Sequence, residues 1–223
     1  AINIIISNHM KRHNNIISTI YKSLNQRSDL NIKFLTPENA TDKNYLSSIA
    51  NKDEYNVLFV PHTGPEVTTQ LLENFNGIKW VQAVGTGVEA LMSSEKIVNN
   101  DDLVLTNLKS VSSVALSEFA MLGALFFTKN VLRFQKLAAK GEWEKPGNLD
   151  IARMSGKNAL VVGLGSIGRE IAKKCAYGFD MEIIGIDRNP DGVPEEAKKM
   201  IKHIGTPDEL PELVKTADFV FAA

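Results

Sequence analysis

The chain is a series of short apolar runs separated by segments of helical length. In the first half these runs are rich in Ile and Val and apolar almost throughout, which is typical of strands buried on both faces of a parallel sheet. The segments between them, such as Asn14–Leu24 and Glu66–Phe75, have the length of helices, so this half predicts repeated strand–helix units. The predicted strands are Ile2–Ile6, Asn31–Leu35, Asn56–Val60, Ile78–Val84 and Leu103–Thr106.

A long apolar segment then interrupts this rhythm. It covers Ser113–Lys140 and predicts one long helix, whose most apolar part, Val114–Phe127, is expected to be buried. The stretch Gly141–Asn148 contains two Gly and one Pro and predicts a loop.

A second series of strand–helix units follows the loop. We therefore expect an α/β protein of two domains, 1–107 and 108–223, joined near residues 107–113, with parallel sheets in both. The predicted strands of the second series are Ala159–Val162, Glu182–Ile186 and Asp218–Phe221, and its predicted helices are Ile167–Phe179 and Pro207–Lys215.

Composition and charge narrow the classes of partner. Of the 223 residues 43% are apolar, and 25 Lys and Arg against 26 Asp and Glu leave no basic excess for nucleic acid or an anionic membrane. No charged-then-apolar leader opens the chain, and Val114–Phe127 is far shorter than the ~20 residues that span a bilayer. The only cysteine, Cys175, lies in a helical pattern and predicts a small core residue, which favours a reducing, cytoplasmic compartment. We expect a small-molecule partner.

The stretch NALVVGLGSIGREIAKK, residues 158–174, places three glycines between a strand and a helix. Gly163, Gly165 and Gly168 have the spacing G-x-G-x-x-G, which provides a tight turn, a close backbone approach to a pyrophosphate and close packing of helix on sheet. Ser166 and Ile167 open the helix, whose first N–H groups suit phosphates. With strand and helix in the required order, the pattern predicts a dinucleotide-binding loop. The alternative is a turn whose glycines serve packing alone.

An acidic residue stands where such a site needs one. Asp187 ends the next predicted strand, 19 residues after Gly168, where a carboxylate accepts hydrogen bonds from the adenosine ribose. Two like charges ~4 Å apart repel by roughly 4 kcal/mol at an effective dielectric of 20, so Asp187 favours NAD over NADP. Arg188 complicates this preference, because an arginine beside the ribose can accommodate a phosphate.

Together these blocks resemble the D-isomer-specific 2-hydroxyacid dehydrogenases, which include phosphoglycerate dehydrogenases, glyoxylate/hydroxypyruvate reductases and D-lactate dehydrogenases. The resemblance covers nearly the whole chain and rests on WVQAVGTGVEAL, SSVALSEFAMLGAL, GEW, the glycine-loop block and ELVKTADFVF, in that order. It implies a flavodoxin-like substrate domain, built from both chain ends, and a Rossmann NAD-binding domain. Because the chain stops on an apolar strand, we expect the Rossmann domain to be incomplete at its C-terminus and the chain to be a segment of a longer protein.

The resemblance also gives residue roles. The backbone N–H groups of Val84, Gly85 and Thr86, in AVGTG, would bind the substrate carboxylate. A loop with glycines after a parallel strand suits an anion, although an ordinary turn is the alternative. Ser113 and Leu116 match positions that face the nicotinamide or its ribose.

Two further residues have structural alternatives. Glu118 matches an acidic residue of the family's long helix, but a glutamate in the first turn of a helix is also stabilised by the macrodipole. Trp143 of GEW is expected to be a packing residue of the hinge region.

The family's reaction implies groups that this chain lacks. It transfers a hydride between nicotinamide and C2 of a 2-keto or 2-hydroxy acid, with an arginine, a histidine and a glutamate that come from later family segments. No catalytic residue is therefore expected here. His9 and His62 follow the first and third predicted strands, but no carboxylate is placed to orient either, and His13 and His203 lie in polar surroundings. No metal-ligand spacing is present.

The sequence thus favours an NAD-dependent 2-hydroxyacid dehydrogenase or 2-ketoacid reductase, of which this segment alone is inactive. A homodimer is expected from the family and from the apolar long helix. The alternatives are a corepressor-like NADH sensor, a truncated inactive relative that still binds nucleotide, and a different Rossmann enzyme. Glyoxylate, hydroxypyruvate, pyruvate and phosphohydroxypyruvate all stay open as substrates.

Overall fold

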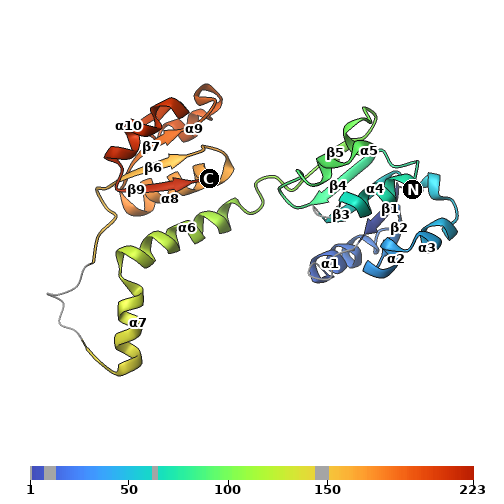
Figure 1. Cartoon of the computed structure of the whole chain (residues 1–223), viewed down its shortest axis with the longest axis horizontal. Helices are drawn as coiled ribbons and strands as arrows, with labels where there is room; N and C mark the ends of the chain where they lie inside the picture. Colours follow the sequence, from blue (N-terminus) through green and yellow to red (C-terminus); the bar gives the residue numbers. More distant parts are fainter. Residues whose placement is uncertain (1, 8–13, 62–64, 144–150) are drawn as a thin grey trace. The chain divides into compact units, whose positions relative to one another are not determined.

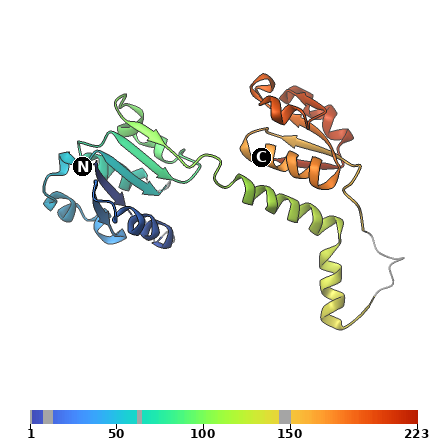
Figure 2. The ribbon, with the colours of Figure 1, turned by 180° about the vertical axis from the view of Figure 1, so that it is seen from behind.

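The computed structural model describes residues 2–7, 14–61, 65–143 and 151–223. The chain forms two compact units, Ala1–Lys109 and Ser110–Ala223, and each is an α/β unit with a parallel sheet. Their elements are labelled in Figure 1 and seen from behind in Figure 2.

The first unit contains a five-stranded sheet of order β2-β1-β3-β4-β5 in which all pairs are parallel. This is the flavodoxin-like order, so the predicted fold class is confirmed. Its strands are β1 (Ile2–Ser7), β2 (Leu30–Leu35), β3 (Val57–Pro61), β4 (Trp80–Val84) and β5 (Val104–Thr106).

Short helices connect these strands. Two begin at polar caps: the Thr36 hydroxyl accepts from the Asn39 N–H at 3.4 Å, and the Asp42 carboxylate accepts from the Asn44 N–H at 2.9 Å. The helices are α1 (Asn14–Leu24), α2 (Pro37–Thr41), α3 (Lys43–Ser48), α4 (Pro65–Asn74) and α5 (Glu95–Val98), with 3₁₀ turns η2 (Lys52–Glu54) and η3 (Leu91–Ser93).

Both faces of this sheet are packed, as its apolar strands predict. Ile5 and Leu58, fully buried, face a core shared with Leu71 of α4 and with Phe75, which directly follows that helix. Alternate residues of the same strands, such as Ile6, face a smaller cluster with the C-terminal part of α1.

The second unit contains four parallel strands in the order β8-β7-β6-β9, the order of the first half of a Rossmann sheet with one strand added. Strand β8 is absent from the sequence-based prediction. The strands are β6 (Asn158–Val162), β7 (Glu182–Ile186), β8 (His203–Gly205) and β9 (Phe219–Ala222), and the helices are α6 (Ser113–Thr128), α7 (Val131–Lys140), α8 (Ser166–Phe179), α9 (Glu195–Lys198) and α10 (Leu210–Leu213).

The prediction of one long helix over Ser113–Lys140 is wrong. Helices α6 and α7 are bent by 64° at a break where Asn130 adopts the left-handed conformation, with φ of 49°. That conformation ends α-helical hydrogen bonding, and Asn is one of the few residues that tolerate it. No helix in the described part of the chain is by itself long and apolar enough to cross a membrane, although this bent pair passes that test together.

Three further expectations need correction. Val114–Phe127 is not a wholly buried helix: Ser117 and Met121 are buried, whereas Phe119 is 73% exposed. Trp143 is 92% exposed, so it does not pack against the residues described. The segment predicted as a helix over Pro207–Lys215 is three short turns, η6 (Pro207–Glu209), α10 and η7 (Val214–Thr216).

Cys175 is buried, as predicted. Its side chain is fully inaccessible in the core of the second unit, and burial raises the pKa of its thiol to about 12. The thiol is therefore protonated and acts as a small core group.

Candidate nucleotide-binding site

The glycine loop connects β6 to α8, and two of its glycines are required by the fold itself. Gly163 has φ of +93°, a conformation that side chains rarely adopt, and a Cβ there would collide with the carbonyl oxygen of Ala223. A Cβ on Gly168 would collide with the carbonyl oxygen of Gly163. These two positions set the turn and the close packing of α8 on the sheet.

Gly165 differs from Gly163 and Gly168, because no described residue requires a glycine there. Its φ of −64° and ψ of −167° are open to any residue, and a Cβ would meet no atom within 4 Å. The space beside it belongs to a cleft. Because Gly165 has no side chain, a ligand in the cleft can approach the backbone closely at this position.

Asp187, at the end of β7, faces the same loop. Its carboxylate accepts from the Leu164 N–H at 2.8 Å and from the Asn189 N–H at 2.9 Å. These two bonds, with that from Asn189 the larger effect, and the nearby charge of Arg188 hold the pKa of Asp187 below its usual value. The carboxylate is therefore ionised, and each oxygen keeps a lone pair for a further donor.

A cavity of about 450 Å³ joins these features within the second unit. It brings together four of the predicted site residues, Gly163, Gly165, Asp187 and Arg188, while Ser166, Ile167 and Gly168 form the first turn of α8 beside it. Its walls are lined by Val162, Gly163, Gly165, Ile186, Asp187, Arg188, Pro207, Leu210 and Ala223.

Five of these wall residues are not among the predicted site residues. Two of the five, Pro207 and Leu210, belong to the turns that follow β8, an element too short to predict from apolar periodicity. A signal was present in TPDE, because Glu209 lies three residues after Thr206 and its carboxylate accepts from the Thr206 N–H at 2.9 Å. That spacing is typical of a helix start.

Ser113 and Leu116 do not line this cavity. Both lie in the first turn of α6, where Leu116 is 47% exposed and Ser113 is 5% exposed. The Ser113 hydroxyl is buried without a hydrogen-bond partner in the part of the chain that the structure describes. A buried hydroxyl without a hydrogen-bond partner costs folding free energy, so this group is placed to bond to a polar ligand. Glu118 is the sixth residue of α6, so its predicted place in the first turn is wrong.

The predicted substrate loop, Val84–Thr86, begins at the last residue of β4 in the first unit. Its carbonyl groups point to the segment after β5: Gly85 accepts from the Leu108 N–H at 2.8 Å, and Thr86 accepts from the Asn107 side chain. In trans peptides the N–H points opposite to the preceding carbonyl, so the Thr86 and Gly87 N–H groups are directed away from that segment. This orientation can serve an anion.

His203 is the histidine whose position the structure describes. His9, His13 and His62 lie outside the described residues. His203 contacts Glu209 at 2.8 Å, with both side chains exposed. Among the residues with described positions, no group of three or more His, Cys, Asp or Glu could hold a metal ion.

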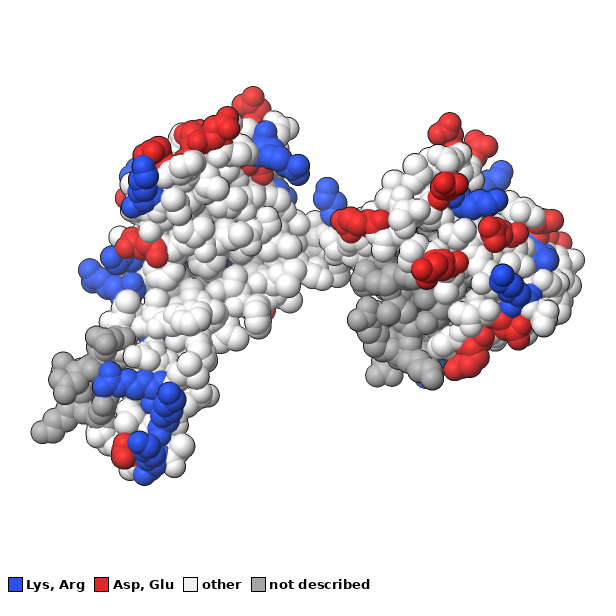
Figure 3. Space-filling view, viewed as in Figure 1, with Lys and Arg blue, Asp and Glu red and all other residues white. Residues whose placement is uncertain are grey.

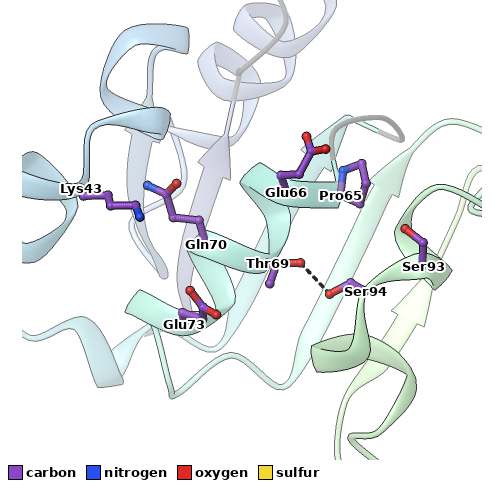
Figure 4. Close-up of a pocket in the computed structure, with 8 residues that line it drawn as sticks. All are labelled: Lys43, Pro65, Glu66, Thr69, Gln70, Glu73, Ser93 and Ser94. Atoms are coloured by element: carbon purple, nitrogen blue, oxygen red, sulfur yellow. Dashed lines mark hydrogen bonds between the residues drawn. The ribbon is translucent and has the colours of Figure 1, made fainter.

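A second cavity, of about 450 Å³, lies in the first unit and contains none of the predicted site residues (Figure 4). Thr69 of α4 and Ser94 meet across it in a hydrogen bond of 2.6 Å, and Glu66 and Glu73 flank it with Lys43. Charges of both signs, together with two hydroxyls that hydrogen-bond to each other, are typical of a solvated polar surface. The nucleotide site is therefore assigned to the second unit.

Comparison with known proteins agrees with this assignment. Residues 121–223 match the model of the D-isomer specific 2-hydroxyacid dehydrogenase NAD binding domain. A D-3-phosphoglycerate dehydrogenase of Methanocaldococcus jannaschii is 28% identical over 182 residues, which are 81% of this chain and 32% of that protein. A hydroxypyruvate reductase of Thermotoga maritima is 26% identical over 75% of this chain and 50% of its own length.

Solved structures show the same fold. A D-isomer specific 2-hydroxyacid dehydrogenase family protein from Aeromonas salmonicida superposes with a TM-score of 0.74 at 18% identity, covering 100% of this chain and 63% of its own. An enzyme from Xanthobacter autotrophicus, in complex with NADPH and MES, gives 0.71 at 17% identity with the same coverage. The chain thus spans a third to a half of these curated relatives and 63% of these solved ones. Together, the glycine loop, its cleft and these similarities show that residues 121–223 are an NAD-binding domain of the D-isomer specific 2-hydroxyacid dehydrogenase type, and the chain as a whole is similar to proteins of that family.

Proposed function

We propose that the protein to which this chain belongs is an NAD-dependent oxidoreductase that interconverts a small 2-hydroxy acid and its 2-keto acid. The open position at Gly165, facing a cleft that also contains Asp187, is the observation that carries the proposal. In this proposal the first unit is the substrate domain and contributes the loop at Val84–Thr86.

The residues present fit NAD. The N–H groups that open the 14-residue helix α8, at Ser166 and Ile167, would face the pyrophosphate, and the missing side chain of Gly165 would admit it. Asp187 would accept from the ribose hydroxyls of the adenosine half. When bound, NAD supplies the nicotinamide ring that accepts or donates the hydride.

Asp187 would also set the preference for NAD over NADP. Its lowered pKa keeps the carboxylate ionised, so a 2'-phosphate placed beside it meets a like charge. Arg188 is exposed next to it and offers partial compensation, which makes the preference a matter of degree. Since a structural relative was solved with NADPH, the preference is a property to be measured in this protein rather than assumed from the fold.

The substrate loop would bind the carboxylate that all 2-hydroxy and 2-keto acids share. Backbone N–H groups at Val84, Gly85 and Thr86 recognise a carboxylate and make no selection on C3. Ser113 and Leu116 would face the nicotinamide half, where the orphaned hydroxyl of Ser113 would find a partner.

A homodimer formed through α6 is part of the proposal. Several large apolar side chains of this helix are exposed, among them Phe119 at 73%, Leu122 at 57% and Phe127 at 80%. On the face seen in Figure 3, charged side chains lie along the rim of the second unit and on α7, and few lie over α6. Large exposed apolar side chains gathered on one helix are typical of an interface. The buried, protonated thiol of Cys175 suits a reducing, cytoplasmic setting.

The experiment compares NADH and NADPH binding by calorimetry in the natural chain and in Asp187→Ala. We expect NADH affinity to fall about 10-fold or more, because charge-assisted hydrogen bonds contribute about 1.5–3 kcal/mol, and the NADH:NADPH ratio to approach one. The ratio is the informative quantity, since any loosening of the loop acts on both nucleotides alike. Unchanged affinity for both would remove Asp187 from the site.

Activity is tested on the full-length protein with NADH and a panel of 2-keto acids. Turnover of one or more of them supports the dehydrogenase. NADH binding without turnover of any would instead favour the corepressor-like sensor or an inactive relative.

A further inference from the structure

The residue between the first two glycines, Leu164, is the anchor of the glycine loop. Its side chain is 2% exposed and lies in the core of the second unit. It packs over Gly185 of β7 so closely that a Cβ on Gly185 would lie 2.7 Å from its Cδ1. The loop is therefore fixed to the sheet by a buried leucine at a position where the nucleotide motif accepts any residue.

Two charged side chains hold the peptide groups on either side of Leu164. Its N–H donates to the Asp187 carboxylate at 2.8 Å. Its carbonyl oxygen accepts from Nη1 of Arg169, also at 2.8 Å. Bonds of this length to charged groups are among the stronger ones in proteins.

These bonds determine where the Gly165 N–H points. The carbonyl of Leu164 and the N–H of Gly165 belong to one planar trans peptide, so they point in opposite directions. By holding the carbonyl, Arg169 turns the N–H away from its own guanidinium. The backbone of Arg169 is fixed as well, because its N–H donates to the Gly165 carbonyl oxygen at 3.0 Å in the first turn of α8.

Arg169 acts from outside the nucleotide cleft. It does not line that cavity and lines instead a groove of about 360 Å³ between α8 and α9, with Lys173 and Tyr177 among the other lining residues. A residue that touches the loop from behind can orient its N–H groups without contact with the nucleotide.

We propose that Arg169 is a positioning residue of the dinucleotide loop, which with Asp187 clamps the two peptide groups of Leu164 and so presents the Gly165 N–H to the pyrophosphate. The inference rests on the proposed function for its ligand and adds a residue that the glycine spacing does not include. The clamp exists before the nucleotide arrives, so it reduces the ordering that binding would otherwise require.

The test uses Arg169→Met, which keeps an apolar stem but no donor, and Arg169→Lys, which restores one donor. Lys173→Met is the matched control. Lys173 lines the same groove one turn further along α8, and its replacement by Met removes the same positive charge. Two probes are titrated, ADP-ribose, which contains the pyrophosphate, and adenosine, which does not. We expect Arg169→Met to weaken ADP-ribose about 10-fold and adenosine less than about 2-fold, Arg169→Lys to recover part of the loss, and Lys173→Met to bind both as the natural chain does.

Amide hydrogen exchange without nucleotide provides an independent readout. Arg169→Met should accelerate exchange at Leu164 and Gly165, and Lys173→Met should not. Unchanged ADP-ribose affinity in Arg169→Met, or an equal loss in Lys173→Met, overturns the inference. A natural chain that binds no ADP-ribose contradicts the proposed function instead, and the exchange rates then decide on the clamp alone. Should Arg169→Met not fold, Arg169→Lys is read against Lys173→Met in the same way.

Discussion

Replacing Gly165 by Ala separates the role of the glycine loop in binding from its role in folding. At Gly163 and Gly168 a side chain would collide with backbone atoms, so their substitution damages the fold together with any site. At Gly165 the added methyl group meets no protein atom within 4 Å, and the backbone angles suit alanine. The methyl group would occupy only the cleft.

The expected change in stability is small, because two effects oppose each other. Alanine restricts the unfolded chain and stabilises the protein by about 0.4–1 kcal/mol. Gly165 is the N-cap of α8, where alanine is poorer than glycine by about 1 kcal/mol. The free energy of unfolding should therefore stay within about 1 kcal/mol of its natural value, which corresponds to about 2–4 °C in Tm.

The expected change in affinity is much larger. A methyl group forced into a packed contact costs about 1–3 kcal/mol, so Gly165→Ala should weaken NADH binding by roughly 5- to 150-fold. Calorimetric titration measures the affinity and thermal unfolding measures the stability, with Gly168→Ala as the comparison that should lower Tm. If Gly165→Ala binds NADH as tightly as the natural chain, the loop does not face the pyrophosphate and the reasoning fails.

Three further predictions concern charge and assembly. NADH affinity should be constant through mildly acidic pH and fall only below the usual titration range of an Asp carboxyl, because the pKa of Asp187 is lowered in the folded chain and only its protonation removes the charge beside the ribose; an affinity that does not fall there contradicts its role. The pKa of Asp218 is also lowered, by the Asn158 N–H and then by Lys157, so Asp218→Asn should lower Tm at pH 7 and lose that effect in acid, which thermal unfolding at both pH values checks. Phe119→Glu should shift a dimer to monomer in light scattering without lowering the Tm of the monomer, because the side chain is 73% exposed; a variant that stays dimeric places the interface elsewhere.

The strands and the longer helices follow from local pattern. The helix Asn14–Leu24 and the strand Glu182–Ile186 occupy the predicted ranges. The apolar runs of buried parallel strands and the 3.6-residue apolar period of amphipathic helices can both be recognised in consecutive residues. Strand β8 could not be found in this way. It has three residues, and it is a strand because Ile204 and its neighbours pair with β7, a tertiary effect.

At the bend between α6 and α7, the backbone conformation of one residue outweighs the apolar pattern of the sequence. Apolar residues continue on both sides of the break and favour one helix, yet Asn130 can adopt the left-handed conformation that ends it. The burial of α6 was overestimated for a related reason. A sequence shows that a helix is apolar but not which partner covers it, and here one side packs on α8 while Phe119 stays exposed.

For the site, the sequence predicted the residues whose geometry is local. Gly163, Gly165 and Gly168 follow from their spacing, and Asp187 from its distance along the chain. The roles of Arg169 and Leu210 at the site could not be found, because TPDE marks only a helix start, and only folding brings a guanidinium to the Leu164 carbonyl and the turn after β8 to the cleft wall.

Amide chemical shifts on titration with NADH test the central claim most directly. If the second unit binds the nucleotide as proposed, the shifts will concentrate on Gly165–Gly168 and on Asp187–Asn189, the residues that line the cleft or border it. Shifts around Thr69 and Ser94 in the first unit instead, or no saturable shifts at all, would contradict the assignment of the nucleotide site.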